Sequence, residues 1–342
     1  MAKNHSGSVD RKVTASDVAE RAGVSKWTVS RAFTEGASIS PRARERVLEA
    51  ANELGYKPNL LARSLTKRRT QMVGLVVDEL ANPNLFLVLD EITRQLQRRG
   101  YMSMLLNISA EHSISSALSL ADQFQVDGLI FLGTILTGEL IELAQDIRHI
   151  PLIVLYRNCD DPNIQVVSTD GYRAGQEIAD LFLEQGYRRV TYMRGPASES
   201  TQLKRLDGFR DGLSDQELEV APILEAGHYR RDCGFDAMRR YLDTTPASDR
   251  VEALFCENDI LAIGAMDALK ARGEEGSIAI IGFDDIEEAD SPGYGLTTYR
   301  QPLEVLVPEA IRRLTATEEQ SERRFLAPGE LIVRSTHLRR QT

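Results

Sequence analysis

Residues 13–33 read VTASDVAERAGVSKWTVSRAF, and this pattern predicts two short helices joined by a tight turn. Thr14 is a favourable N-cap for the first helix, because its side-chain oxygen can accept a hydrogen bond from a free backbone N–H. Gly23 can adopt the positive φ that ends this helix. Ser25 then caps a second helix, which we expect over Lys26–Phe33. The stretch therefore predicts a compact helical head.

A third helix is expected after Ser40–Pro41, a cap followed by proline at the first helical position, and it would end at Gly55. Its apolar residues recur at helical spacing: Val47, Leu48, Ala51 and Leu54. Three helices within about 40 residues, with a glycine turn between the first two, are typical of a helix-turn-helix unit. The second helix would lie in the major groove of DNA, and its outward residues would be Lys26, Trp27, Thr28, Ser30 and Arg31. Many three-helix bundles bind no DNA, so a purely structural bundle is the alternative.

Charge is distributed unevenly along the 342 residues, whose net charge is −10. Residues 1–69 contain 14 lysines and arginines against 7 acidic residues, whereas the remainder contains 27 basic and 44 acidic residues. A basic head on an acidic chain suggests that a polyanion is bound by the head alone. The alternative is a basic helical surface that is merely solvated.

Between the head and the rest of the chain, Tyr56–Leu65 reads YKPNLLARSL. The Lys57–Pro58 step bars an uninterrupted helix, which favours a linker. Proline can also open a helix, and Asn59–Leu65 contains no helix breaker and places Leu61 and Leu65 four residues apart. Because so short a helix is unstable alone, we expect it to form only when DNA is present. A flexible tether is the alternative.

From residue 70 onwards, short apolar segments alternate with amphipathic ones. Strands are predicted over residues 72–77, 101–106, 126–133, 151–156, 190–193, 253–256, 277–283 and 330–336. Helices are predicted over residues 85–99, 114–124, 139–146, 171–185, 205–213, 231–242 and 260–272. Apolar strands between amphipathic helices are typical of doubly wound α/β folds with parallel sheets covered on both faces. The pattern restarts after residue 170, which predicts two similar lobes of ordinary domain size.

Polar side chains follow four of the predicted strands. They are Asp78, Arg157, Asn258 and the pair Asp284–Asp285. Ligands bind parallel sheets beyond the C-terminal ends of the strands, so we expect these residues to line a cleft. Carboxylates and amides suit sugar hydroxyls, because each can take part in several hydrogen bonds. Each residue alone also has a simpler interpretation as an ordinary polar loop residue.

Other functional classes leave no pattern in the sequence. No apolar run reaches the roughly 18–20 residues that cross a bilayer, and the N-terminus lacks the apolar segment of a signal peptide, so we expect a cytoplasmic protein. Cys159, Cys233 and Cys256 fit neither a disulfide framework nor a zinc site. The dinucleotide-binding, P-loop and nucleophile-elbow motifs are absent, and the five histidines show no metal spacing. We therefore predict no enzyme, no cofactor and no metal.

The head resembles the lactose/galactose repressor (LacI/GalR) family of transcriptional regulators at nearly every position from Val13 to Leu65. The match covers the segments VTASDVAERAGVSKWTVSRAF and SPRARERVLEAANELGYKPNLLARSL. It implies base-reading roles for Lys26, Trp27 and Arg31. It also implies contacts to the DNA backbone by Thr14, Ser25, Thr28 and Ser30. The hinge helix of the family enters the minor groove, which by resemblance assigns this role to Ala62, Arg63 and Leu65.

The remainder resembles the same family, whose body has the two-lobed fold of periplasmic sugar-binding proteins. This match is carried by VGLVVDELANPN, VDGLIFLG, LKRLDGF, ENDILAIGAMDAL, IIGFDD and LTTYRQP. It implies effector contacts by Asp78, Asn84, Arg157, Arg205, Tyr229, Asn258, Asp284 and Gln301. Many members carry two aromatic residues after Asn82–Pro83, whereas this chain has Asn84 and Leu85. That difference favours a more polar or open-chain ligand over a stacked ring.

The resemblance also predicts the division of the chain. A disordered tail (1–10), a helix-turn-helix domain (11–57) and a hinge helix (58–69) would precede the body. The N-terminal lobe would comprise residues 70–168 and 300–328, and the C-terminal lobe residues 169–299 and 329–342. Because no leucine heptad follows the final strand, a homodimer is the expected assembly.

These features predict a sequence-specific transcriptional regulator that represses a carbohydrate-utilisation operon from a pseudo-palindromic operator. Its effector would be a sugar, a sugar acid or a sugar phosphate held between the lobes, since two arginines in one cleft tolerate a carboxylate or phosphate. A regulator that responds to a nucleobase or nucleoside is one alternative. A ligand-binding protein without a DNA function and an enzyme of doubly wound fold are the others.

Overall fold

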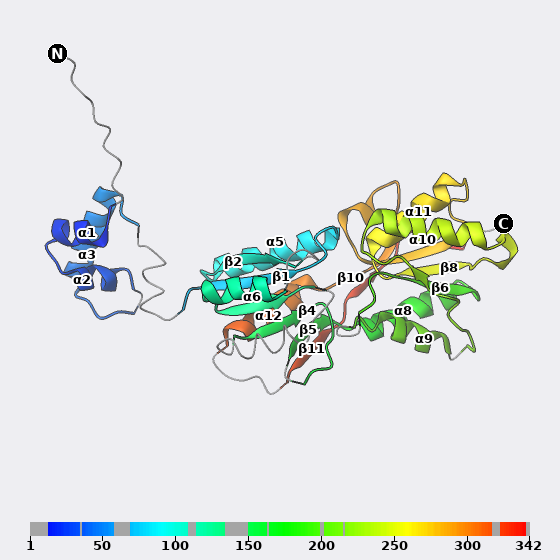
Figure 1. Cartoon of the computed structure of the whole chain (residues 1–342), viewed down its shortest axis with the longest axis horizontal. Coiled ribbons are helices and arrows are strands. Elements are labelled where there is room, and N and C mark those ends of the chain that lie inside the picture. Colours follow the sequence, from blue (N-terminus) through cyan, green and yellow to red (C-terminus); the bar gives the residue numbers. More distant parts are fainter. Residues whose placement is uncertain are drawn as a thin grey trace, which may run out of the picture. The chain divides into compact units, whose positions relative to one another are not determined.

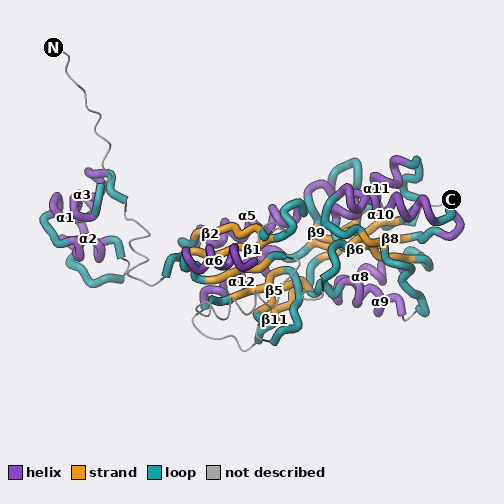
Figure 2. The backbone as a smooth tube through the Cα atoms, viewed as in Figure 1, coloured by secondary structure: helices purple, strands orange, loops and turns teal. Residues whose placement is uncertain are grey.

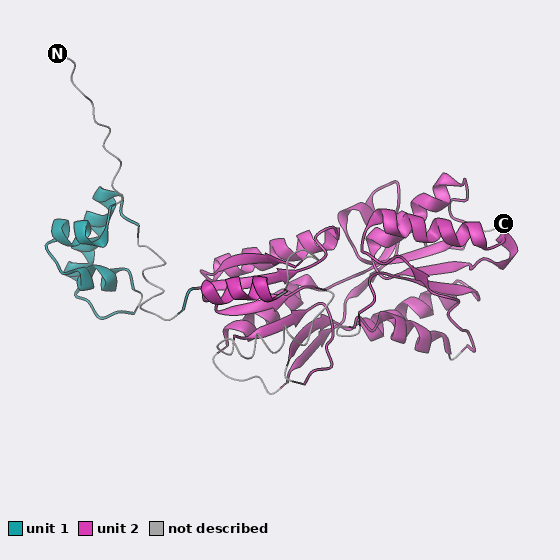
Figure 3. Cartoon of the chain, viewed as in Figure 1, with its two compact units in different colours: residues 1–70 teal, residues 71–342 magenta. Residues whose placement is uncertain are grey.

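The computed structural model describes residues 13–34, 36–57, 69–108, 114–133, 150–162, 164–198, 202–214, 216–316 and 322–339. The chain forms two compact units, Met1–Thr70 and Gln71–Thr342 (Figure 3). The predicted N-terminal tail, the predicted hinge helix and the helix expected over residues 139–146 lie outside the described residues. Within the described part, no helix combines the length and the apolar character needed to span a bilayer.

The described residues of the first unit form α1 (Ala15–Ala22), α2 (Lys26–Ala32) and α3 (Pro41–Leu54). At the start of α1, the Thr14 N–H and hydroxyl both donate to the Asp17 carboxylate, 2.8 and 2.7 Å away. Gly23 ends α1 with φ 62°, as the turn between the first two helices requires. The Ser25 and Ser40 hydroxyls cap the other two helices. The helix-turn-helix prediction is thus confirmed at the level of local structure.

The core of this unit is small and consists mainly of valine and alanine. Val18, Val29 and Val47 are at most 1% exposed, and alanines from all three helices complete the cluster. Leu48, for which helical spacing predicts an inward position, is 45% exposed, so that prediction is wrong. The inward face of α3 is instead made by Val47, Ala50 and Ala51, because small residues let the three short helices approach closely and leave only a narrow buried stripe.

The second unit contains two six-stranded sheets in its described residues (Figures 1 and 2). The first has the order β11-β5-β4-β3-β1-β2 and is parallel throughout. Its strands are β1 (Met72–Val77), β2 (Met102–Asn107), β3 (Gly128–Phe131), β4 (Leu152–Leu155), β5 (Gln165–Thr169) and β11 (Arg324–Ala327). The second has the order β12-β10-β9-β8-β6-β7. Its strands are β6 (Val190–Arg194), β7 (Leu224–Glu225), β8 (Ala253–Cys256), β9 (Ala279–Asp284), β10 (Thr297–Arg300) and β12 (Glu330–Ile332).

Helices cover both faces of each sheet, which explains why the central strands are apolar without alternation. On the first sheet, α5 (Pro83–Arg98) and α12 (Leu303–Thr315) share one core cluster, and α6 (Ile114–Gln123) contributes to the cluster on the other face. On the second sheet, α8 (Gly171–Glu184) pairs with α9 (Arg205–Ser214), and α10 (Arg231–Thr244) pairs with α11 (Asp259–Ala271). Two short 3₁₀ turns occupy Ala247–Asp249 and Glu287–Asp290. The α/β two-lobed fold class is therefore confirmed.

The described connections between the lobes follow β5, β10 and β11. The sequence patterns did not predict β5, β7, β10, β11 or α12, whose helical pattern is interrupted by Pro308. One further prediction is corrected: β12 pairs antiparallel with β10, so the second sheet is not entirely parallel. The reason is the short connection at Gly329, which returns the chain from one lobe to the other along the edge of the sheet. A Cβ at Gly329 would lie 2.2 Å from the Arg300 carbonyl oxygen, so the approach requires glycine.

Candidate DNA-binding surface and ligand pocket

The second helix of the head presents a polar outer face. Lys26, Trp27 and Ser30 are exposed, whereas Val29 and Ala32 on the opposite face are buried. Trp27, the single tryptophan of the chain, keeps 66% of its surface in contact with solvent. The predicted base-reading residues therefore share one accessible face of α2.

Arg31 differs from its neighbours because two internal contacts hold it. Its Nε donates to the Ser38 carbonyl oxygen at 2.8 Å. Its guanidinium carbon lies 4.4 Å from the centroid of the Trp27 ring, within the range of a cation–π contact. Both contacts restrict the orientation of the Arg31 side chain. The arrangement fixes Arg31 before any DNA arrives.

The hydroxyls predicted to contact the DNA backbone have internal roles as well. The Thr14 hydroxyl donates to Asp17, and the Ser25 and Thr28 hydroxyls lie 2.9 Å apart. Ser30 is exposed on the outer face of α2, where its carbonyl accepts a hydrogen bond from the Thr34 hydroxyl. The predicted minor-groove residues Ala62, Arg63 and Leu65 lie outside the described residues.

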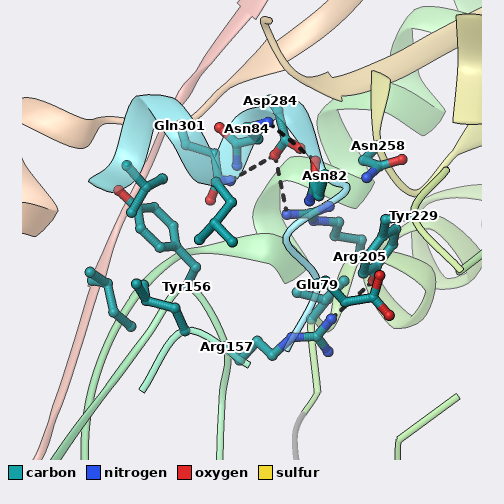
Figure 4. A pocket seen from close by; sticks show the side chains of 15 residues that line it. Glu79, Asn82, Asn84, Tyr156, Arg157, Arg205, Tyr229, Asn258, Asp284 and Gln301 are labelled. Carbon is teal, nitrogen blue, oxygen red and sulfur yellow. Dashed lines mark hydrogen bonds and ion pairs between the residues drawn. The ribbon is translucent and has the colours of Figure 1, made fainter. Parts of the chain in front are cut away.

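A pocket is lined by residues of both lobes (Figure 4). It is lined by Glu79, Asn82, Asn84, Leu85, Val88, Leu132, Leu155, Tyr156, Arg157, Leu203, Arg205, Tyr229, Asn258, Asp284 and Gln301. Seven of the eight predicted effector-binding residues are in this set. Asp78 is the exception, because its carboxylate lies against Gly133, where a Cβ would come within 2.9 Å of Oδ2. Sequence patterns do not fix which way the last side chain of a strand points.

Asp284 and Gln301 form a buried polar cluster on one side of the pocket. The Gln301 amide donates to Asp284 Oδ1 at 2.7 Å, and the Thr169 hydroxyl donates to the Gln301 oxygen at 2.7 Å. Thr169 and Gln301 lie at two different connections between the lobes, so this cluster joins the pocket to these connections. Burial raises the pKa of Asp284 to about 7, although the nearby Arg205 guanidinium lowers it.

Arg205 begins α9 and is 5% exposed. Its guanidinium stacks on the Phe283 ring, 3.3 Å from the centroid, and donates to the Glu257 carbonyl oxygen. One of its terminal nitrogens lies 4.0 Å from Asp284 Oδ1. A guanidinium and a carboxylate side by side can both donate to and accept from a single ligand hydroxyl or amide.

Arg157 and Tyr229 connect the two lobes across the pocket. Arg157 follows β4 of the first lobe and donates to the Tyr229 hydroxyl at 3.0 Å. Tyr229 belongs to the second lobe and donates to Glu257 Oε2 at 2.9 Å. Glu257 was missed by sequence reasoning, although a charged residue immediately after the apolar strand β8 is a usable signal.

Two polar atoms of the pocket are buried without a hydrogen-bond partner among the described residues: Asn258 Nδ2 and the Tyr156 hydroxyl. Asn258 uses its oxygen to cap α11 by accepting from the Leu261 N–H at 3.2 Å, which leaves the amide hydrogens free for a ligand acceptor. Tyr156 and Asp284 also leave their strands with positive φ, 69° and 116°. Unsatisfied polar atoms and unusual backbone angles both carry a free-energy cost, and they concentrate at binding sites.

The apolar part of the pocket lining comes mainly from the first lobe. It consists of Leu85, Val88, Leu132 and Leu155, together with Leu203 from the second lobe. The Asn82 side chain caps α5 by accepting from the Asn84 N–H at 3.2 Å, which brings the start of this helix to the pocket. The pocket therefore offers a ligand both hydrogen-bonding groups and apolar surface.

Two family comparisons account for most of the chain. Residues 70–291 match the family described as "Periplasmic binding proteins and sugar binding domain of LacI family", and residues 14–59 match "Bacterial regulatory proteins, lacI family". The chain belongs to the LacI family. Like the family as a whole, this LacI-family member is a DNA-binding transcriptional regulator and not an enzyme.

Individual relatives match the chain over nearly its full length. The transcriptional regulator CelR of Thermobifida fusca is 32% identical over 342 residues, covering 96% of this chain and 97% of CelR. The transcriptional repressor PurR of Edwardsiella ictaluri is 30% identical over 342 residues, covering 93% of this chain and 98% of PurR. The solved structure of the lac repressor dimer bound to operator and the anti-inducer ONPF has a TM-score of 0.83 at 23% identity, covering 96% of this chain and 100% of that chain. The last similarity confirms the fold of this regulator.

Proposed function

We propose that this regulator is a repressor that binds a pseudo-palindromic operator as a homodimer and responds to a small molecule in the interlobe pocket. The single observation that carries the proposal is that seven residues predicted as effector contacts, from segments far apart in the sequence, line one buried pocket. The exposed outer face of α2 supports the DNA-binding half of the proposal. Two heads related by a two-fold axis would occupy two half-sites.

The favoured effector is a neutral sugar or a sugar derivative. Asp284, Arg205 and Asn258 offer a carboxylate, a guanidinium and an amide on one side of the pocket, which together suit vicinal hydroxyls. Arg205 already donates to the Glu257 carbonyl and lies beside Asp284, so it offers less to a fully charged ligand. The negative charge of a sugar acid or sugar phosphate would have to compete with the carboxylates of Asp284 and Glu79 for the arginines of the pocket. The similarity to CelR supports the carbohydrate class.

A nucleobase or nucleoside is the second candidate. The apolar wall formed by Leu85, Val88, Leu132 and Leu155 can cover one face of a flat ring. Asp284 and Asn258 could pair with the donors and acceptors at the edge of such a ring. The similarity to PurR over 342 residues supports this class. The two candidates differ in their contact with these apolar side chains. A flat ring would pack against them, whereas a sugar would contact them less.

The effector acts by favouring one arrangement of the lobes over another. Its effect on operator affinity cannot exceed its differential affinity for the two arrangements, which is typically about 1–3 kcal/mol. We propose that the hinge over residues 58–69 transmits the change, with Ala62, Arg63 and Leu65 entering the minor groove. If residues 59–65 are replaced by glycine and serine, the ligand response should disappear. A response that survives this replacement would show that the segment is only a tether.

The function is tested by selecting genomic DNA fragments with the purified chain and repeating the binding with a panel of sugars, sugar acids, sugar phosphates and nucleobases. The expected fragments share an inverted repeat, and one class of ligand changes their affinity. The direction of the change distinguishes an inducer from a corepressor. Binding of no fragment above random DNA, with and without every ligand, would overturn the proposal.

A further inference from the structure

The carboxylate of Glu257 lies at the end of β8, is 7% exposed, and does not line the ligand pocket itself. Both of its oxygens accept hydrogen bonds. Oε1 accepts from the Tyr192 hydroxyl at 3.0 Å, and Oε2 accepts from the Tyr229 hydroxyl at 2.9 Å and from the Gly195 N–H at 2.7 Å. A buried carboxylate without such donors would be strongly unfavourable, so these contacts hold their partners in place.

Glu257 determines the orientation of the Tyr229 hydroxyl. An ionised carboxylate can only accept, so the single hydroxyl proton of Tyr229 points to Glu257. The oxygen lone pairs of Tyr229 are then available to Arg157 Nη2, 3.0 Å away in the other lobe. The ring of Tyr229 is fixed as well, because a Cβ on Gly195 would come within 2.2 Å of it. The hydrogen bonds therefore run in one direction, from Arg157 through Tyr229 to Glu257.

The same residue also positions the second arginine of the pocket. The Glu257 carbonyl oxygen accepts a hydrogen bond from Arg205, whose guanidinium stacks on Phe283. Glu257 therefore contacts Arg205 directly, through its carbonyl oxygen, and contacts Arg157 indirectly, through the Tyr229 hydroxyl. Arg157, Tyr229 and Glu257 come from separate segments of the chain, Arg157 from the first lobe and the other two from the second.

We propose that Glu257 is a positioning residue that holds Tyr229 against Arg157 and thereby keeps the two lobes closed around the pocket. The inference rests on the proposed function only in treating that pocket as the effector site. The contact between His228 and Glu79, which also joins the lobes, is a weaker candidate for this role. His228 and Glu79 approach to 3.4 Å, but the His228 side chain is 68% exposed, and exposed ion pairs contribute little.

A backbone bridge beside Arg157 reports the separation of the lobes. The Asn158 N–H donates to the Gln202 carbonyl at 2.8 Å, and the Gln202 N–H donates back to the Asn158 carbonyl at 2.9 Å. Asn158 follows β4 of the first lobe, and Gln202 precedes α9 of the second. Their amides can exchange with solvent deuterium only when this bridge opens, so exchange at these two positions measures lobe opening without any ligand or DNA.

The test compares hydrogen exchange of the full chain and three variants at the Asn158 and Gln202 amides. Glu257→Gln keeps the size of the side chain but has one acceptor oxygen for three donors, so exchange at both amides should rise about tenfold. Tyr229→Phe removes the hydroxyl that joins Arg157 to Glu257, and exchange at both amides should rise by a similar factor. Tyr192→Phe removes a donor to Glu257 that contacts neither Tyr229 nor Arg157 through a hydrogen bond. Exchange at both amides should stay unchanged in this variant.

Three results would overturn the proposal. The first is unchanged exchange at Asn158 and Gln202 in both Glu257→Gln and Tyr229→Phe. The second is an equal rise in Tyr192→Phe, and the third is a rise throughout β6 and β8, which would mean a general loss of packing. If Glu257→Gln does not fold, Tyr229→Phe still decides between the outcomes. Because no operator is used, failure here is distinguishable from failure of the proposed function.

Discussion

The outer face of α2 and the lining of the interlobe pocket are both polar, but one is exposed and the other is buried. Trp27 is 66% exposed, whereas Arg205 is 5% exposed. Side chains on α2 lose their hydration only when DNA covers them, so their contribution to binding depends on that partner and on salt. The pocket side chains lost their hydration when the chain folded and are held by hydrogen bonds to one another. Substitutions in the pocket should therefore have larger effects than substitutions on α2.

Asp284→Ala should give the largest effect. It removes a buried carboxylate that accepts from Gln301 and faces Arg205, so ligand affinity should fall by about 2–5 kcal/mol while operator affinity without ligand is nearly unchanged. Calorimetry with the ligand found in the screen measures the first quantity, and gel shifts measure the second. Glu287→Ala, which removes an exposed carboxylate nearby, is the control. Undiminished ligand binding by Asp284→Ala would remove this residue from the site.

The buried carboxylate should also make stability depend on pH. Burial raises the pKa of Asp284 to about 7, so between about pH 4 and 7 the folded protein holds a proton that the unfolded chain has released. The contribution of Asp284 to stability therefore falls as the pH rises through this window, and levels off above it. Asp284→Asn should remove a fall on the order of 4 kcal/mol. Urea unfolding of both proteins from pH 4 to 8 checks this, and identical slopes would contradict it.

On the exposed surface, Arg31→Ala should have a smaller effect that is confined to sequence discrimination. Loss of a bidentate contact to guanine should cost about 1–3 kcal/mol on the operator and much less on random DNA. Arg42→Ala, an exposed arginine on α3, is the control and should weaken both DNAs alike. Gel shifts with operator and shuffled sequences make the measurement. An equal loss on both DNAs for Arg31→Ala would place Arg31 on the phosphate backbone instead.

Trp27→Ala should give the smallest effect, because it removes only the ring beneath Arg31 while the Ser38 carbonyl still holds Nε. A cation–π contact at an exposed site is worth about 0.5–1 kcal/mol, and operator discrimination should fall by that amount. Trp27→Phe keeps a ring in place and should restore most of it. A loss equal to that of Arg31→Ala, unrelieved by phenylalanine, would mean that Trp27 contacts a base directly, as the family resemblance implies, and does not act only through Arg31.

The sequence was sufficient for the head and for the alternation of strands and helices, because caps, glycine turns and apolar periodicity are local signals. It failed where the outcome depends on packing. Leu48 has helical spacing but lies beside the narrow buried stripe, and β10, TTYR, lacks the apolar run that marks the predicted central strands. Strand ends predicted Asp78, Arg157, Asn258 and Asp284 as cleft residues, whereas the family resemblance alone supplied Asn84, Arg205, Tyr229 and Gln301, and Glu257 was missed. Its partners Tyr192 and Tyr229 are 65 and 28 residues away, and only folding brings them together.

The central claim is that occupancy of the pocket controls the affinity of the head for DNA. It is tested most directly by titrating a selected operator fragment with the full chain, in the absence and in the presence of the ligand from the same panel that stabilises the chain most against thermal unfolding. A coupling of about 1–3 kcal/mol, and its absence in Asp284→Ala, is the result we predict. A ligand that binds the wild-type chain in the pocket while leaving operator affinity unchanged would contradict the claim.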